Sequence, residues 1–86
     1  MEIVYTSKGQ ADVQFWKKSG KKNVTDKITA LLLSINESPY TGTGKPEPLK
    51  HNLSGLWSRR INQEHRLIYE VLPDKIIIHS LRGHYN

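Results

Sequence analysis

The chain has 86 residues, a length that suits one domain over 1–86. It contains no cysteine, which excludes disulfide frameworks and thiolate metal sites and fits a reducing cytoplasm. No apolar run approaches the roughly 20 residues of a membrane span, and no leader-like segment follows Met1, so we expect a soluble protein with no membrane partner. The formal charge of +5, from 13 Lys and Arg against 8 Asp and Glu, favours a polyanionic partner, either nucleic acid or an acidic protein segment.

The N-terminal segment predicts a strand followed by a short helix. Residues 2–6 are β-prone, and Ser7 with Gln10 three positions later matches a capping box at a helix start. The helix should extend to about residue 18, where a Gly-containing polar stretch interrupts it. We expect its apolar face to comprise Ala11, Phe15 and Trp16.

A second helix is predicted next, because apolar residues recur there at helical spacing. They occupy positions 24, 28, 31, 32 and 35. Pro39 marks the end of this helix or lies just beyond it. Residues 38–56 then hold three of the four prolines and three of the six glycines, which predicts a long loop. Loops of this length in compact domains are usually functional or disordered.

The C-terminal part predicts three strands joined by tight turns. Apolar and polar residues alternate over 57–62 and 65–71, and a further β-prone run covers 75–81. The short connections "NQE" and "LPD" make these strands antiparallel neighbours. The two helices must then cover one face of a small, mainly antiparallel sheet, which gives a two-layer α+β domain with one partly open sheet face.

Arginine side chains are expected on the open sheet face. Arg59 and Arg60 are adjacent on one strand, so they point to opposite faces and only one of them can join a given site. Arg60 lies on the side away from the apolar residues of its strand, and a tight hairpin brings Arg66 near it. Two guanidinium groups can bind a phosphate together. From the residues alone, ordinary solvated arginines are the alternative.

The sequence also offers groups for acid–base chemistry. No two histidines have the spacing of a metal-binding helix, so we expect no metal site. His79 reads as a packed or edge histidine, whereas His84, beside Tyr85 after the last strand, is either a general acid or part of a frayed terminus. Glu47 stands between prolines in "KPEPLK", near Lys50, on stiff extended backbone. It fits a general base or an exposed loop glutamate.

The run "GKPEPLKHNLSGLWSRRINQEHRLIYEV", with the closing "HY", resembles the YoeB/Txe family of bacterial toxins, within the wider RelE-like group of ribonucleases. The run covers about a third of the chain, and the strand–helix–helix order before it also fits. The resemblance implies a RelE-like fold similar to microbial ribonucleases. It further implies a toxin that cleaves mRNA in the ribosomal A site, without a metal ion or other cofactor, and so inhibits translation.

The resemblance assigns a role to each matching side chain. Glu47 would take the proton from the ribose 2′-OH, Arg66 would stabilise the scissile phosphate, and His84 would protonate the 5′-oxygen leaving group. Tyr85 would help to orient the nucleotide. The products would be a 2′,3′-cyclic phosphate and a 5′-hydroxyl. We expect supporting contacts to phosphate from Lys50, Arg60 and, as a third candidate, Arg59.

The partners that the resemblance implies are mRNA, the ribosome with its RNA, and a YefM-like antitoxin. Operator DNA would be bound only through the antitoxin complex, and a homodimer stays open. Two other functions compete with this one. The first is a non-catalytic basic module that captures an acidic antitoxin segment or DNA, and the second is a ribonuclease that cuts RNA without the ribosome. Loss of activity on removing Glu47 or His84 would separate the enzymes from the binding module.

Overall fold

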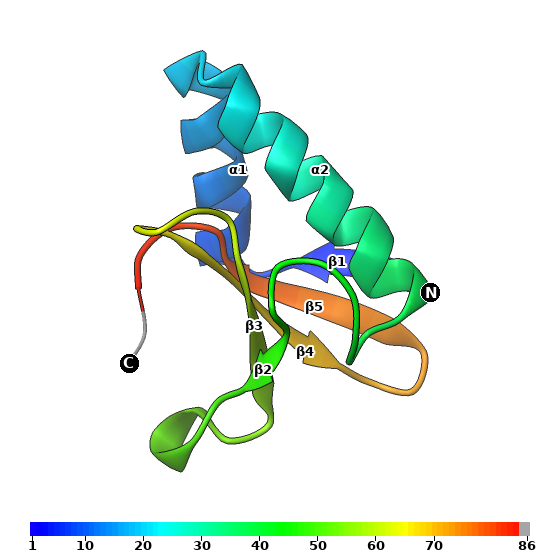
Figure 1. Cartoon of the computed structure of the whole chain (residues 1–86). Helices are drawn as coiled ribbons and strands as arrows, with labels where there is room; N and C mark the ends of the chain where they lie inside the picture. The colour runs from blue at the N-terminus through cyan, green and yellow to red at the C-terminus, as the bar shows by residue number, and fades with distance from the viewer. Residues whose placement is uncertain (85–86) are drawn as a thin grey trace.

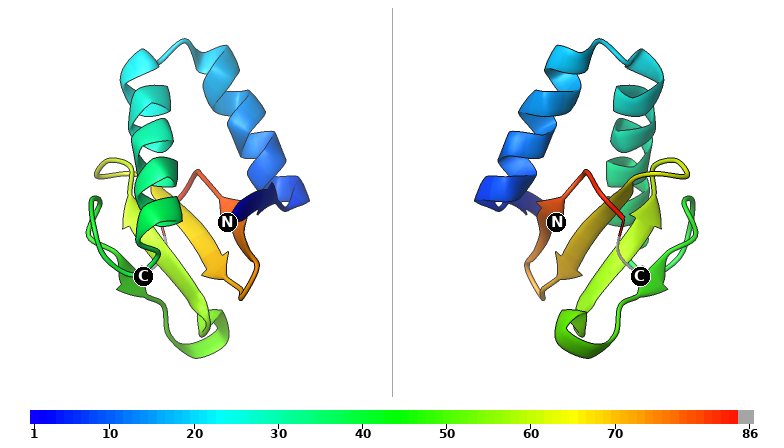
Figure 2. Two further views of the ribbon diagram at one scale, coloured as in Figure 1. Left: turned by 90° about the vertical axis from the view of Figure 1, so that its right-hand side faces the viewer. Right: turned by 90° about the vertical axis from the view of Figure 1, so that its left-hand side faces the viewer.

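The computed structural model describes residues 1–84, which form two layers with both helices on one face of a five-stranded sheet (Figure 1). Both side views place the helices on the same side of the sheet (Figure 2). The elements in chain order are β1 (Glu2–Tyr5), α1 (Ser7–Ser19), α2 (Lys22–Glu37), β2 (Glu47–Pro48), a 3-10 turn (His51–Leu53), β3 (Leu56–Arg60), β4 (Arg66–Val71) and β5 (Lys75–Ser80). The predicted α+β class is confirmed.

The sheet has the strand order β1-β5-β4-β3-β2. Strands β3, β4 and β5 are antiparallel neighbours, as the short turns predicted. Strand β1 pairs in parallel with β5 at one edge, and β2 pairs antiparallel with β3 at the other. The prediction of one long loop over 38–56 is wrong in its second half, because Glu47 lies opposite Ser58 and Pro48 lies opposite Trp57.

Helix α2 packs on the sheet through the stripe that its sequence predicted. Its buried residues are Val24, Ile28, Leu31 and Ile35. They join a hydrophobic core with the inward side chains of β4 and β5, among them Leu67, Tyr69, Ile76 and Ile78. Within residues 1–84, neither helix has the length and apolar composition needed to cross a membrane.

Helix α1 begins with a different cap from the predicted one. Thr6, rather than Ser7, is the N-cap, and its hydroxyl accepts a hydrogen bond from the Gly9 amide at 3.0 Å. The predicted capping box of Ser7 with Gln10 is therefore wrong, because the cap lies one residue earlier and its third helical residue is a glycine without a side chain. The Thr6 amide in turn donates to the Ile78 carbonyl at 3.0 Å, so the start of the helix is fixed to β5.

The buried face of α1 comprises Gly9, Asp12 and Trp16, so it agrees with the predicted face only at Trp16. Ala11 and Phe15 are exposed, contrary to the prediction. Gly9 is needed because a Cβ there would lie 2.5 Å from the Ile78 carbonyl oxygen. Asp12 can be buried because its carboxylate accepts a hydrogen bond from the Leu81 amide at 2.9 Å. A helix that buries a glycine and a carboxylate has no plain apolar stripe for sequence analysis to find.

Arg59, on the helix-facing side of β3, has the largest fully buried side chain in the described part of the molecule. Its Nε donates to the Tyr69 hydroxyl (3.1 Å) and its Nη1 to Ser34 Oγ on α2 (2.7 Å). Its other bonds go to the carbonyl oxygens of Ser38 (2.7 Å), Thr41 (2.8 Å) and Thr43 (3.0 Å). Every acceptor is neutral. Carbonyl dipoles, including that of Ser38 at the end of α2, therefore stabilise the buried charge.

These bonds fix the segment 38–44 between α2 and β3. The Tyr69 hydroxyl donates to the Pro39 carbonyl at 2.7 Å, and the Arg60 amide donates to the Gly44 carbonyl at 2.7 Å. Gly44 has a φ of 83°, and a Cβ there would come within 2.7 Å of a methyl carbon of Leu31. Because this segment is fixed, the chain enters β2 at one defined point, which places Glu47 on the face away from the helices.

We expect Arg59→Met to lower the free energy of unfolding by about 3 kcal/mol or more, because several buried carbonyl and hydroxyl groups lose their hydrogen-bond donor. Urea denaturation followed by circular dichroism measures the change. The matched control is Arg60→Met on the neighbouring, exposed residue, for which we expect a change within about 0.5 kcal/mol. Equal losses in the two variants would contradict the anchoring role of Arg59.

Burial raises the pKa of the Tyr69 hydroxyl above its ordinary value of 10.0, and the Arg59 guanidinium offsets part of this rise. The unfolded chain therefore ionises first, so the stability due to neutral Tyr69 is complete below about pH 10 and is lost as the pH rises through the folded-state pKa. We expect the free energy of unfolding to fall more steeply above about pH 10 in the wild type than in Tyr69→Phe. Parallel curves for the two proteins would contradict this.

Candidate active site

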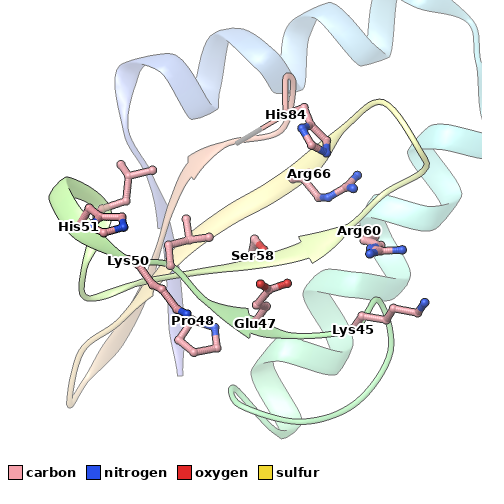
Figure 3. Close-up of a pocket in the computed structure, with 11 residues that line it drawn as sticks. Lys45, Glu47, Pro48, Lys50, His51, Ser58, Arg60, Arg66 and His84 are labelled. Atoms are coloured by element: carbon pink, nitrogen blue, oxygen red, sulfur yellow. The ribbon is translucent and has the colours of Figure 1, made fainter. Parts of the chain in front are cut away.

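A cleft of about 420 Å³ lies on the sheet face opposite the helices (Figure 3). Residues from the segment around β2, from β3 and β4, and from the chain beyond β5 line it. Among residues 1–84, its titratable lining residues are one carboxylate and six basic side chains, namely Glu47, Lys45, Lys50, His51, Arg60, Arg66 and His84. One carboxylate beside so many basic groups suits an anionic ligand whose chemistry needs a proton acceptor.

Glu47 is held by β2 and by restricted backbone on either side. Its pairing with Ser58 places the carboxylate over the open face of β3, and Figure 3 shows it directed into the cleft. Lys45 and His51, before and after β2, have φ values of 53° and 60°. Such left-handed conformations are costly for residues other than glycine and occur preferentially at functional sites.

Arg60 and Arg66 lie directly opposite each other on β3 and β4. The Nη1 of Arg66 is held by turn carbonyls, at 2.7 Å from Asn62 O and 3.2 Å from His65 O. Neither arginine takes part in an ion pair within residues 1–84. Like charges directly across a strand pair are destabilising. A bound anion between the two guanidinium groups would remove this repulsion.

His84 reaches the cleft from a segment that is fixed at several points. Trp16 Nε1 donates to the Leu81 carbonyl at 2.8 Å, and the Arg66 amide donates to the Gly83 carbonyl at 2.9 Å. These bonds direct His84 toward the same space as Glu47 and Arg66 (Figure 3). An acid–base pair flanking an arginine has the components for phosphodiester cleavage.

The residues that the sequence singled out are mostly brought together. Glu47, Lys50, Arg60, Arg66 and His84 all line the cleft, while Tyr85 lies outside the described residues. Arg59, the third phosphate-binding candidate, does not reach the cleft, because its guanidinium is buried on the opposite face and bonded within the protein.

Other residues near the cleft were not singled out. They include Lys45, His51 and Ser58, which line it, and His65, which contacts the segment carrying His84. In the sequence, only their position within the 28-residue run quoted above indicated that these residues lie near the site. His79 is partly buried and pairs with Glu70 at 3.0 Å, as expected for a packed or edge histidine. Within residues 1–84, no three His, Asp or Glu side chains are grouped so as to hold a metal ion.

Comparison with known proteins identifies the family. A family model for the YoeB-like toxin of bacterial type II toxin–antitoxin systems matches residues 5–85. The chain belongs to this family. Toxin YoeB of Escherichia coli K12 is 44% identical over 85 residues, which cover 99% of this chain and 100% of that YoeB. The resemblance stated from the sequence is confirmed.

Solved structures of YoeB proteins share this fold. The YoeB/ParE toxin from Agrobacterium tumefaciens superposes with a TM-score of 0.94 at 37% identity, covering 99% of this chain and 100% of that one. YoeB from Staphylococcus aureus, in a heterotetrameric complex with YefM, superposes with a TM-score of 0.88 at 41% identity, covering 99% and 98% of the two chains. Each superposition covers nearly all of both chains, so the likeness is not confined to one part of the fold.

Sulfate should stabilise the folded protein through the Arg60–Arg66 pair. An anion at ten times its Kd stabilises by about 1.4 kcal/mol, or about 6–11 °C in Tm for a domain of this size. We expect Arg66→Gln to reduce the sulfate-dependent rise in Tm, measured against chloride at equal ionic strength. Arg82→Gln is the control, since Arg82 lies over the Phe15 ring instead of lining the cleft. Equal rises in both variants would contradict an anion site at this pair.

Proposed function

We propose that this protein is a ribosome-dependent endoribonuclease that cleaves mRNA in the ribosomal A site. The observation that carries the proposal is the convergence of Glu47, Arg66 and His84 on one cleft from three separate segments of the chain. Membership of the YoeB-like toxin family supports it. The action would take place in the cytoplasm, where ribosomes translate mRNA.

The proposed reaction is an internal transesterification that uses only protein side chains. Glu47 accepts the proton of a ribose 2′-OH, and the 2′-oxygen forms a bond to the adjacent phosphorus. Arg66, assisted by Lys50 and Arg60, stabilises the charge that develops on the phosphoryl oxygens. The bond from phosphorus to the 5′-oxygen then breaks, and His84 protonates that oxygen. The products are a 2′,3′-cyclic phosphate and a 5′-hydroxyl.

Dependence on the ribosome follows from geometry in this proposal. The 2′-oxygen, the phosphorus and the 5′-oxygen must lie in line, and alignment of reacting groups is worth several orders of magnitude in rate. Flexible RNA rarely adopts this arrangement, whereas an mRNA held in the A site can be presented in it. Tyr85 is proposed to stack on the exposed base. The formal charge of +5 suits the approach to ribosomal RNA.

We further propose that a YefM-like antitoxin inhibits the toxin. One structure of YoeB from S. aureus is a heterotetrameric complex with YefM, and another structure of YoeB from that organism is a dimer. An acidic, initially disordered antitoxin segment would complement the basic cleft and could cover Arg60 and Arg66. Operator DNA would be reached only through the antitoxin, and a homodimer is the proposed assembly of the free toxin.

We expect Glu47→Gln and His84→Gln each to slow cleavage by about 10²–10⁴-fold, because each removes one proton-transfer group. The measurement maps cuts in one mRNA, first naked and then on ribosomes with an empty A site, and identifies the product ends. Glu37→Gln is the matched control, on an exposed glutamate at the end of α2.

Each outcome of this mapping has a distinct meaning. Cuts within the A-site codon only on ribosomes support the proposal. Equal cutting of naked RNA would indicate a ribonuclease that does not need the ribosome. No cutting by folded wild-type protein would leave a binding module for an acidic antitoxin segment or DNA.

A further inference from the structure

His65 occupies the junction between the β3–β4 turn and β4, and it contacts the segment that carries His84. Its Nδ1 lies 3.1 Å from the Gly83 amide, which donates a hydrogen bond to it. Its ring packs edge-on against the Trp16 ring at 5.0 Å between centroids. It is partly buried and does not line the cleft, so it does not touch the reacting groups in the proposed reaction.

We propose that His65 is a positioning residue, whose Nδ1 holds the backbone before His84 so that the general acid faces the scissile phosphate. This inference rests on the proposed function of the cleft. It assigns a role to a side chain outside the acid–base set, and the role depends on one acceptor atom rather than on the whole ring.

The geometry around Gly83 shows why one acceptor has this influence. Gly83 has a φ of 97°, a conformation that glycine adopts readily but other residues do not, so the chain can rotate there with little resistance. The peptide group before Gly83 is held by His65 Nδ1, and the one after it is held by the Arg66 amide at 2.9 Å. His65 and Arg66, at the start of β4, thus fix both peptide planes that set the direction of His84.

His65 also connects the segment of the general acid, His84, with the phosphate-binding arginine, Arg66. The His65 carbonyl accepts a hydrogen bond from Arg66 Nη1 at 3.2 Å, while its imidazole accepts one from Gly83. Because the Gly83 amide donates to Nδ1, this nitrogen carries no proton, and the proton of the neutral ring is on Nε2. Trp16, whose Nε1 donates to the Leu81 carbonyl at 2.8 Å, supports the ring from the helix side.

Two substitutions distinguish the role of the Nδ1 acceptor from the role of the aromatic ring. His65→Phe keeps an aromatic ring against Trp16 but removes the acceptor. His65→Asn loses the ring, yet its Oδ1 can occupy the position of Nδ1 and accept from Gly83. A purely structural role predicts that activity follows stability, with Phe better than Asn. The positioning role predicts the opposite order of activity.

The first experiment measures single-turnover cleavage of mRNA on ribosomes, together with the toxin concentration at half-saturation and the Tm. We expect His65→Phe to cleave about 10–100-fold more slowly than the wild type with unchanged half-saturation, since misplacement of a reacting group by about 1 Å costs up to about 100-fold in rate. We expect His65→Asn to stay within a few-fold of the wild type despite a lower Tm. Wild-type rates in His65→Phe, or rates that follow Tm, would overturn the inference.

The second experiment does not depend on catalysis. We expect the Gly83 amide, followed by hydrogen exchange in NMR spectra, to exchange faster in His65→Phe than in the wild type or His65→Asn. Equal protection in all three proteins would overturn the inference, whatever the cleavage rates. If the wild type does not cleave mRNA at all, the proposed function fails, and the exchange rates alone then decide whether His65 holds this segment.

Discussion

The buried guanidinium of Arg59 is the interaction on which the arrangement of the cleft depends. It bonds α2, β4 and the carbonyls of segment 38–43, so it joins parts of the chain that are distant in sequence. A buried charge with neutral partners is stable only if all its donors are satisfied. The segment must therefore adopt one conformation, and that conformation sets the position of Glu47.

The open sheet face differs from this buried site, because the charged side chains that line its cleft form no ion pair within the described residues. Arg60 opposes Arg66, and six basic side chains surround one carboxylate. Such a surface costs stability in the free protein and becomes favourable when an anion binds. The contrast between Arg59 and Arg60, adjacent in sequence, shows how strand alternation assigns one arginine to the core and the next to the cleft.

The fold could be predicted wherever side chains follow a simple period. The α2 stripe and the three C-terminal strands are confirmed because burial on one face imposes a period of 3.6 or 2 residues. The prediction failed for α1, where a glycine and a hydrogen-bonded carboxylate replace apolar residues on the buried face. It also missed β2, since two residues pairing at a sheet edge leave no periodic signal.

The sequence by itself determined the fold class and the family, and it singled out five of the side chains that line the cleft. It could do so because the charges and the glycine and proline positions of the matching run are local and visible in the residues. Only the tertiary structure decided that the Arg59 guanidinium is buried among neutral acceptors, and that His65 contacts the Gly83 amide. Both facts depend on contacts between residues 10 or more positions apart, whose geometry exists only once the sheet has formed. A sequence pattern records which residues are present, whereas the direction of a buried side chain depends on every element packed around it.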